Sequence, residues 1–234
     1  MRIVALDIET LTPDWGPSCK GWEPERFAPL PYHKPCVVAW IEAILDVDEI
    51  DLKLRKWVQG SSLLQSPIAA IREDIMGADR IVTWNGRRFD MPLLNLCAME
   101  TGIDWSFWID RRHRFPNYRN PLRHYDLADQ IGDYATSLGL DATARRLGLA
   151  GKLDVDGSQV RDIWEDDPDL VVRYCCEDVF ETFMIYLRWV LTFESPYDES
   201  ADQARKWIFE SIKWASKIPE LKRLAEMIDD TETV

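Results

Sequence analysis

The sequence feature that most constrains the fold is the opening run, Arg2–Thr10 (RIVALDIET). It begins as a short apolar segment rich in β-branched residues, which is typical of a buried strand. Asp7 and Glu9 interrupt this segment near its end, and side chains two residues apart on a strand point to the same face. Two like charges so close repel each other unless a positive group lies between them. The pattern therefore predicts a strand that ends at a cation site.

Carboxylates in this arrangement suit a hard divalent cation. Magnesium prefers oxygen ligands, usually a couple of carboxylates together with phosphate and water. The alternative is that Glu9 is a solvated residue at the start of a loop, because acidic triplets of this kind also occur by chance. Residues elsewhere in the sequence are needed to distinguish these two interpretations.

The composition narrows the class of protein. The chain has 234 residues, of which 46% are hydrophobic and 11 are Trp, so one large core can form. Its net charge is −13 and its pI is near 4.7. A protein that binds duplex nucleic acid by neutralising phosphates is usually basic, so this class is disfavoured. A negative net charge is still compatible with an enzyme that binds phosphate through metal ions and a local strip of basic residues.

The cysteine pattern indicates a reducing compartment, and the short apolar runs indicate that no segment spans a membrane. The five cysteines show no C-x-x-C spacing, and with only three His residues a zinc site is not expected. Asp7 ends the first apolar run too early for a signal peptide, and no run approaches the length of a membrane span. We therefore expect a cytoplasmic protein with no membrane contact.

Strand-like and helix-like patterns indicate an α/β fold. Cys36–Asp46 and Ile50–Val58 read as strands, and with the first strand they predict an antiparallel meander. Leu63–Met76 has helical spacing, Arg80–Trp84 reads as a short buried strand, and Phe107–Asp110 reads as another strand. From there on strands and helices alternate, which predicts parallel additions to a mixed central sheet flanked by helices.

The second half of the chain reads as mostly helical. Tyr125–Gln130 is expected to open a helix, with Asp126 at its start as a cap or as a group that supports the site. Further helices are expected at Leu138–Gly148, Ser158–Trp164 and Pro168–Trp189.

The composition becomes more charged from Ser195 onward, and two amphipathic helices are expected at Ala201–Ile218 and Pro219–Ile228. We therefore expect a main domain over residues 1–194 and a helical extension over residues 195–234. The extension could dock on the body, form a self-association contact or bind a protein partner.

A second chemical cluster follows the strand that ends at Trp84. Asn85 and Gly86 predict a sharp turn at the end of the strand. Asp90 then begins an apolar helix, where a carboxylate is favoured by the free amides and the helix dipole. Asp90 is therefore either an ordinary helix cap or a member of the acidic site.

A third cluster lies in the long helix that is expected at Pro168–Trp189. Tyr174 and Asp178 are four residues apart, so they share one face of the helix. Leu170 lies on the same face, which indicates that this face points inward. A buried Asp needs a partner, and a metal ion would supply one.

Two irregular segments carry the aromatic and basic residues that a nucleic-acid strand could contact. Leu11–Pro35 is rich in Pro and contains Trp15, Trp22, Phe27 and Tyr32, which either stack on bases or pin the loop to the body. Arg111–His124 combines five Arg with aromatic residues, which suits a phosphate backbone with unpaired bases. The alternative is a solvated loop that balances the acidic surface.

The order of these clusters resembles a known family. A strand with Asp-x-Glu, a strand followed by Asn-Gly-x-x-Phe-Asp, and a late helix with Tyr-x-x-x-Asp are similar to the tyrosine branch of the DEDD (DnaQ-like) superfamily of 3′–5′ exonucleases. The closest resemblance is to the stand-alone enzymes related to the proofreading domain of family B DNA polymerases. It covers residues 1 to about 190 and includes Tyr-Asp-Leu at 125–127 and Leu-Gly-Leu-x-Gly-Lys at 147–152.

The resemblance implies a ribonuclease H-like fold and assigns roles to residues. The tyrosine branch is favoured because Arg173 occupies the position where the histidine branch carries its His. Substrate contacts are implied for Thr10, Leu11, Asn85 and Phe89, and the basic segment adds Arg111, Arg112 and Arg114. The metal ligands are implied to be Asp7, Glu9, Asp90 and Asp178, and Tyr174 is implied to act on the attacking water.

The chemistry fits this resemblance. Two divalent ions about 4 Å apart, Mg²⁺ or Mn²⁺, can activate water on one side of a phosphodiester and stabilise the departing oxygen on the other. Four carboxylates suit two such ions near charge neutrality. We therefore expect a 3′–5′ exonuclease that releases 5′-mononucleotides from single-stranded nucleic acid, with DNA favoured over RNA. The alternatives are a catalytically idle nucleic-acid-binding module and a phosphohydrolase that acts on small nucleotides.

Overall fold

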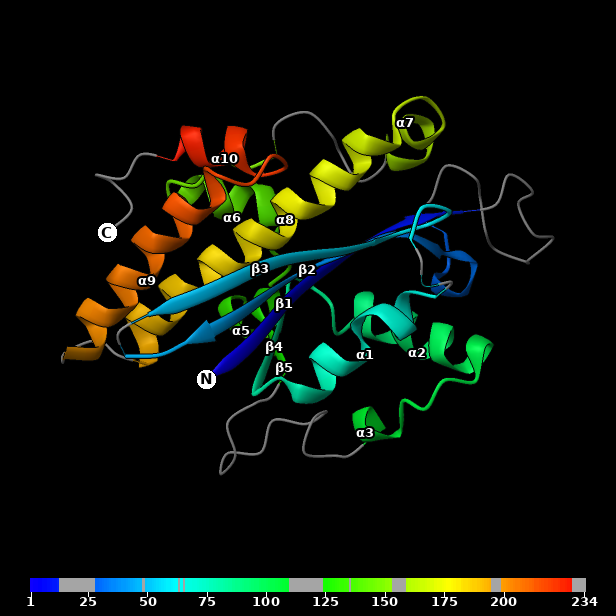
Figure 1. Cartoon of the computed structure of the whole chain (residues 1–234), viewed down its shortest axis with the longest axis horizontal. Helices are drawn as coiled ribbons and strands as arrows, with labels where there is room; N and C mark the ends of the chain where they lie inside the picture. The colour runs from blue at the N-terminus through cyan, green and yellow to red at the C-terminus, as the bar shows by residue number, and fades with distance from the viewer. Residues whose placement is uncertain are drawn as a thin grey trace.

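The centre of the protein is a mixed five-stranded sheet in the order β3-β2-β1-β4-β5 (Figure 1). The computed structural model describes residues 1–12, 28–47, 49–62, 64, 66–109, 124–134, 136–152, 159–194 and 199–228. β1, β2 and β3 form the expected antiparallel meander, and β4 and β5 continue the sheet parallel to β1. The strands are β1 (Arg2–Leu11), β2 (Lys34–Leu45), β3 (Ile50–Val58), β4 (Arg80–Thr83) and β5 (His124–Asp126).

Helices cover both faces of this sheet, so the predicted α/β class is confirmed (Figure 1). One face carries α8, with α9 and α10 packed beside it, and the other face carries α1 and α2. The helical segments are η1 (Leu30–Tyr32), α1 (Pro67–Gly77), α2 (Asp90–Thr101), α3 (Ser106–Ile109), α5 (Leu127–Ile131), α6 (Leu140–Arg146), α7 (Val160–Asp166), α8 (Pro168–Trp189), η3 (Val190–Glu194), α9 (Glu199–Ala215) and α10 (Lys222–Met227).

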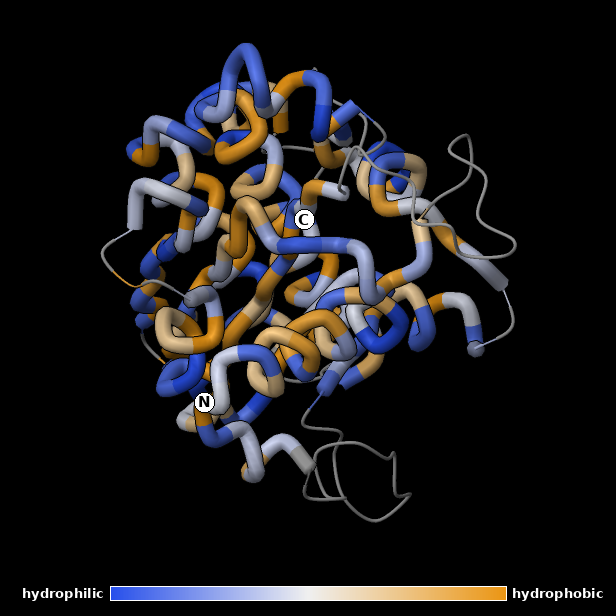
Figure 2. Tube along the Cα trace, turned by 90° about the vertical axis from the view of Figure 1, so that its right-hand side faces the viewer, coloured by the Kyte–Doolittle hydropathy of each residue, from blue (hydrophilic) through white to orange (hydrophobic). Residues whose placement is uncertain are grey.

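The strict alternation of β1 explains why the sheet has two apolar faces. Ile3 and Ala5 point into the core that α8 closes, whereas Val4 and Leu6 point into the core that α1 and α2 close. All four side chains are fully buried, as expected for the middle strand of a sheet covered on both sides. In Figure 2 the hydrophobic residues gather along the inner elements, and the hydrophilic ones lie mainly on turns and outer helices.

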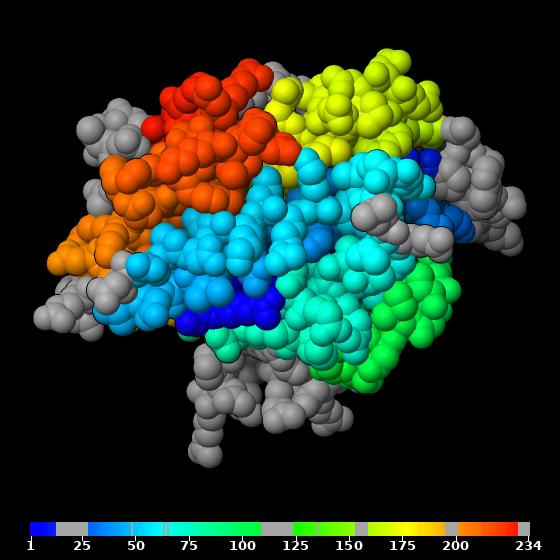
Figure 3. Space-filling model, viewed as in Figure 1, coloured from blue at the N-terminus to red at the C-terminus, as the bar shows by residue number. Residues whose placement is uncertain are grey.

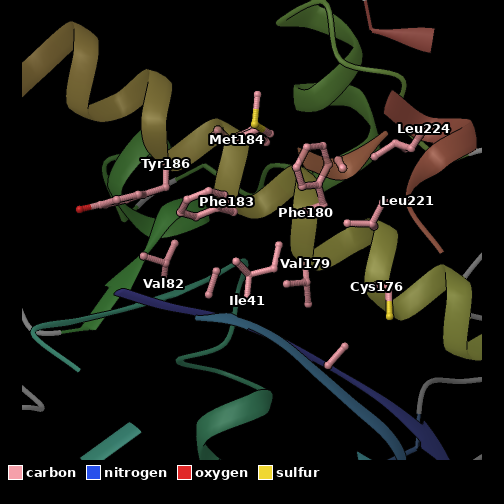
Figure 4. Close-up of a cluster of buried hydrophobic side chains, with 14 of the residues drawn as sticks. Ile41, Val82, Cys176, Val179, Phe180, Phe183, Met184, Tyr186, Leu221 and Leu224 are labelled. Atoms are coloured by element: carbon pink, nitrogen blue, oxygen red, sulfur yellow. The ribbon is translucent and has the colours of Figure 1, made fainter. Parts of the chain in front are cut away.

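Helix α8 is the longest helix among the described residues and the main element of its core. Its predicted bounds, Pro168–Trp189, are confirmed. Asp167 caps the first turn by accepting a hydrogen bond from the Leu170 amide at 3.1 Å, and Pro168 is tolerated there because its missing N–H would have no partner. Phe180, Phe183 and Tyr186 are fully buried, and Figure 4 shows Phe180 on the side of Leu224, whereas Tyr186 packs beside Tyr125 of β5.

The C-terminal helices dock on the body, which was one of the expected alternatives. Ile208 of α9 and Leu224 of α10 are fully buried and belong to the same apolar core as α8 and β1. α9 packs on α8 and on β3, and Figure 3 shows its surface against that of the meander. Both helices are shorter than expected, because α9 ends at Ala215 and α10 begins only at Lys222. The division into two domains at residue 195 stays a prediction.

One predicted strand is wrong. Phe107 lies in the short helix α3, not in a strand. The carboxylate of Asp104 accepts a hydrogen bond from the Ser106 amide at 2.9 Å, and the Trp108 amide donates to the carbonyl of Trp105 at 3.0 Å. These bonds start a helical turn in a segment whose apolar composition alone favours a strand.

Two predicted helix starts are also corrected. α1 begins at Pro67 rather than at residue 63, because the hydroxyl of Ser66 accepts a hydrogen bond from the Ala69 amide. The segment at Tyr125 belongs to strand β5, and α5 begins only at Leu127. No helix within the described residues is long and apolar enough to cross a membrane.

We predict that α9 unfolds together with the body. Ile208→Ala should lower the free energy of unfolding by about 2–5 kcal/mol, because it leaves a cavity in the shared core. The matched control is Phe209→Ala on the same helix, where the side chain is 46% exposed and the loss should stay below about 1 kcal/mol. Urea titrations followed by circular dichroism measure both. A separate early transition for Ile208→Ala, with the main transition unmoved, would contradict the shared core.

Candidate metal centre and active site

Three of the predicted ligands converge at the carboxyl end of β1. Asp7, Glu9 and Asp178 each offer a carboxylate oxygen, and these atoms lie within 4.8 Å of one another. Asp7 and Glu9 point to the same side of β1, as the strand period requires, and Asp178 approaches from α8. Residues 171 positions apart in the chain thus share one acidic pocket.

Asp90 faces this pocket from the first turn of α2. Its side chain is buried, and its atom Oδ1 has no hydrogen-bond partner among the described residues. Burial, followed by the charge of Asp7, raises the pKa of Asp90, and after burial the charge of Asp90 is one of several that raise the pKa of Glu9. A buried carboxylate oxygen without a partner is costly, and a cation at this position would satisfy it.

Burial raises the pKa of every carboxyl group in the pocket, and neighbouring negative charges raise it further for Glu9, Asp90 and Asp178. Burial raises the pKa of Asp7 to about 6. Burial, followed by the negative charges of Asp7 and Asp178, raises the pKa of Glu9 well above its usual value. The pKa values of Asp90 and Asp178 rise for the same two reasons, with Asp7 as the main neighbouring charge. Without a bound cation, the pocket therefore resists the simultaneous ionisation of its four carboxyl groups.

Tyr174 lies one helical turn before Asp178 and is buried beside it. Burial, followed by the charge of Asp178, raises the pKa of the Tyr174 hydroxyl far above its usual value. The hydroxyl therefore stays neutral across the physiological range and can orient a water molecule without ionising.

Lys152 also belongs to the pocket, although the sequence analysis gave it no role. Its ammonium group donates a hydrogen bond to the hydroxyl of Tyr174, lies 4.7 Å from the centre of the Tyr174 ring, and is 3.7 Å from Oδ2 of Asp178. Its positive charge lowers the pKa values of Asp7, Glu9 and Asp178 against the effect of burial. The Gly-Lys pair at the end of the 147–152 segment was the available signal.

A network of hydrogen bonds fixes the backbone of Lys152. The Gly151 amide donates to Oε1 of Glu181 at 2.5 Å, and the Lys152 amide donates to Oδ1 of Asp141 at 2.8 Å. Arg145 donates to the Lys152 carbonyl at 2.6 Å and to Asp141 at 2.8 Å. Gly151 has φ of +70°, and a Cβ atom there would lie 2.6 Å from Asp141 Oδ1. Glycine is therefore the residue that this turn requires.

The turn after β4 presents Asn85 at the same edge of the sheet. Asn85 adopts a left-handed conformation with φ of 59°, and its side chain is exposed. The buried carboxylate of Asp126 accepts hydrogen bonds from the Asn85 amide at 2.9 Å and from the Arg87 amide at 2.8 Å. Of the two expected roles for Asp126, the structure therefore favours support of the site over a helix cap.

Thr10 and Phe89 meet at His33 on the α2 side of β1. The Thr10 hydroxyl lies 2.7 Å from Nδ1 of His33, and Nε2 lies 3.0 Å from the carbonyl of Ala28. Because a carbonyl only accepts, Nε2 carries the proton and Thr10 donates to Nδ1. The Phe89 ring contacts the His33 ring edge to face, with centroids 5.2 Å apart. Leu11 packs against the opposite core, so it does not share this contact.

Part of the predicted substrate surface cannot be placed. Arg111, Arg112 and Arg114 lie outside the described residues, as do Trp15, Trp22 and Phe27 of the first loop. Their roles stay predictions.

Comparison with known proteins agrees with the sequence resemblance. The profile of a family described as "Predicted 3'-5' exonuclease related to the exonuclease domain of PolB" matches residues 25–223. The chain belongs to this family. The match includes Asp90, Tyr174 and Asp178 and begins after Asp7 and Glu9, and it extends through α9 into α10.

The fold of this PolB-related exonuclease chain is also found in a solved polymerase. The family B DNA polymerase from the hyperthermophilic archaeon Pyrobaculum calidifontis superposes with a TM-score of 0.54 and 20% sequence identity. The similarity covers 91% of this chain and 29% of the polymerase, which shows a ribonuclease H-like fold like that of the polymerase exonuclease domain. No curated protein matches the chain.

The four acidic residues of this family member fit divalent cations. All donors are carboxylate oxygens, which suits a hard ion, and the pocket holds one buried oxygen atom, Asp90 Oδ1, that lacks a hydrogen-bond partner among the described residues.

We predict that Mg²⁺ stabilises the protein at pH 8 and does not do so at pH 5. A carboxyl group whose pKa is raised on folding stabilises the fold at low pH, and this contribution is lost as the pH rises through the folded value, about 6 for Asp7. Only the ionised pocket binds the cation well. The rise at pH 8 should be about 1–2 kcal/mol, or roughly 2–8 °C in melting temperature. Differential scanning fluorimetry measures it.

Asp7→Asn should raise the metal-free melting temperature at pH 8 and abolish the response to Mg²⁺, because it removes one repelling charge and one ligand. The control is Asp202→Asn, whose side chain is 85% exposed on α9, and it should keep the response. A wild-type melting temperature that ignores Mg²⁺ and Mn²⁺ at both pH values would contradict the metal centre.

Proposed function

We propose that the protein is a 3′–5′ exonuclease that hydrolyses terminal phosphodiesters of single-stranded DNA and releases 5′-mononucleotides. The observation that carries this proposal is the convergence of Asp7, Glu9 and Asp178 within 4.8 Å, with the unpartnered oxygen of Asp90 facing them. The relation to the exonuclease domain of PolB, and the fold similarity to a DNA polymerase, support DNA as the substrate.

The pocket would hold two divalent cations, Mg²⁺ or Mn²⁺, on Asp7, Glu9, Asp90 and Asp178. Such ions lower the pKa of bound water and stabilise negative charge on a departing oxygen. The four carboxylates supply about four negative charges against the four positive charges of two ions, so the filled pocket would be near neutrality.

Tyr174 is the residue that orients the attacking water. Its neutral hydroxyl accepts a hydrogen bond from Lys152 and donates one to Asp178, so both neighbours fix its position. A buried hydroxyl held in this way places a water molecule with little loss of entropy when the reaction begins.

Lys152 supplies positive charge beside the reacting phosphate. Its ammonium group already lies between Tyr174 and Asp178, so it needs no large movement to contact a phosphate oxygen bound in the pocket. A fixed positive charge is most effective where negative charge develops in the transition state and water is excluded.

The terminal nucleotide is proposed to bind on the α2 side of β1. Thr10 and Phe89 lie on that side, Asn85 lies on the neighbouring turn, and Leu11 follows Thr10 on the other face of the strand. Arg111, Arg112 and Arg114 are proposed to contact the phosphate backbone farther along the strand.

The activity test uses a 5′-labelled single-stranded DNA oligonucleotide with Mg²⁺, Mn²⁺ or EDTA. We predict a ladder that shortens from the 3′ end with metal and no cleavage with EDTA. Asp7→Ala and Asp178→Ala should each lower kcat at least about a thousandfold, because each removes a metal ligand. Asp202→Ala is the surface control. Binding without cleavage, hydrolysis of free nucleotides alone, or near-normal turnover in either pocket variant would contradict the proposal.

The Lys152 network predicts non-additive effects on kcat. Lys152→Met should lower kcat about 10- to 100-fold, because it removes the charge at the phosphate. Asp141→Ala should cause a smaller loss, because it frees the Lys152 backbone without touching substrate. Added to Lys152→Met, the Asp141 substitution should cost little more, since both act through one side chain. Fully additive losses in single-turnover assays would contradict the positioning role of Asp141.

A further inference from the structure

The edge of the sheet beyond Asn85 carries a group of residues that the proposed chemistry leaves unused. The carboxylate of Asp126, at the end of β5, holds the Asn85 and Arg87 amides, so it ties the turn after β4 to the next strand. β5 lies two strands from β1 in the sheet order. Side chains on this turn therefore lie on the same carboxyl edge as the metal centre, displaced toward β5.

We propose that Arg87, Arg88 and Tyr134 form a subsite for a nucleotide upstream of the scissile bond in a single-stranded nucleic acid. Tyr134 would stack on the base, and Arg88 would contact the phosphate. This inference rests on the proposed exonuclease function and extends it to a second binding position.

The ring of Tyr134 is exposed and held in place. It is 46% exposed, and its hydroxyl accepts a hydrogen bond from Nε2 of Gln130 at 2.7 Å. The guanidinium carbon of Arg87 lies 5.5 Å from the ring centroid, which is a cation–π contact. A base that stacks on a ring fixed in this way orders few new groups, so the contact costs little entropy.

The backbone that presents this ring is strained. Asp133 and Tyr134 have φ values of 50° and 58°, which is a left-handed conformation that non-glycine residues rarely adopt. The Tyr134 amide donates to the carbonyl of Asp129 at 2.9 Å and so closes the turn. Strain of this kind persists where the surrounding structure fixes it, and it gathers at ligand-binding positions.

The charge around the ring favours a phosphate. Oδ2 of Asp129 lies 3.5 Å from Arg87 Nε, and Oδ1 lies 3.7 Å from Arg88 Nη2, so two guanidinium groups face one carboxylate. The Arg88 side chain is 63% exposed, and Arg87 Nε is buried without a hydrogen-bond partner among the described residues. In a chain of net charge −13, the exposed guanidinium of Arg88, on the same edge of the sheet as the acidic pocket, offers a contact to an anionic backbone.

The test measures binding, so it does not depend on cleavage. Fluorescence anisotropy of a 5′-fluorescein-labelled oligothymidylate of ten nucleotides is recorded with the full chain carrying Asp178→Asn, which prevents hydrolysis. Arg88→Ala and Tyr134→Leu should each raise Kd at least about fivefold, and less for a dinucleotide than for the decamer. Tyr134→Phe should bind within about twofold of the parent, because it keeps the stacking face.

The control is Lys53→Ala, which removes a half-exposed positive charge from β3. If Arg88→Ala and Tyr134→Leu bind the decamer as tightly as this control does, the proposed subsite is wrong, whether or not the wild type cleaves DNA.

The remaining outcomes separate stacking, the subsite and the proposed function. If Tyr134→Phe binds as weakly as Tyr134→Leu, the ring acts through its hydroxyl, and the proposed stacking is wrong. If the parent binds but the wild type never cleaves, the proposed function fails and the subsite stands. Absence of any binding overturns both.

Discussion

The structure depends on one electrostatic constraint, which is the confinement of four carboxyl groups in a nearly buried space. Asp7, Glu9, Asp90 and Asp178 cannot separate, and burial raises the pKa of each of them. Without a cation, burial disfavours their ionisation, and the ammonium group of Lys152 offsets part of the negative charge. Such an arrangement costs stability in the apoprotein, and it is also the arrangement that binds divalent cations best.

The fold enforces this confinement through its middle strand. β1 pairs with β2 on one side and with β4 on the other, and its apolar side chains are locked in two separate cores. α8 crosses the sheet and brings Tyr174 and Asp178 to the end of β1, where its own core residues hold it. A register shift between Glu9 and Thr10 lets the strand change direction just after the acidic pair. The site is thus as rigid as the core beneath it.

The sequence predicted correctly those helices and strands whose bounds are set by residues within or next to the element itself. The bounds of α8 follow from Asp167 and Pro168 at its start, and the meander follows from the alternation in β3. The prediction of a strand at Phe107 was wrong. The hydrogen bond that the Asp104 carboxylate accepts starts a helical turn there, and the apolar composition of the segment gives no sign of this bond. The helices expected at Leu138–Gly148 and Pro219–Ile228 are also shorter than expected, because α6 spans only Leu140–Arg146 and α10 only Lys222–Met227.

The pairing of Asp7 with Glu9, and of Tyr174 with Asp178, could be predicted from the strand and helix periods, whereas their grouping with Asp90 in one site was implied by the resemblance to the exonuclease superfamily. The structure brings together Asp7, Glu9 and Asp178, and it places Tyr174 and Asp90 beside them. Lys152 was missed although the Gly-Lys pair at 151–152 was visible, because its position depends on hydrogen bonds that the backbone of this pair donates to Glu181 and Asp141. The same holds for the contact of Asp126 with the turn after β4, which joins residues about 40 positions apart.

The most direct test of the acidic pocket is anomalous diffraction from a crystal soaked with Mn²⁺ and a 5′-mononucleotide. We predict two Mn²⁺ peaks between β1, α2 and α8. Their protein ligands should be Asp7, Glu9 and Asp178, and Asp90 Oδ1 should bind directly or through one water. A pocket without anomalous density at saturating Mn²⁺ and pH 8, with the four carboxyl groups in their present positions, would contradict it.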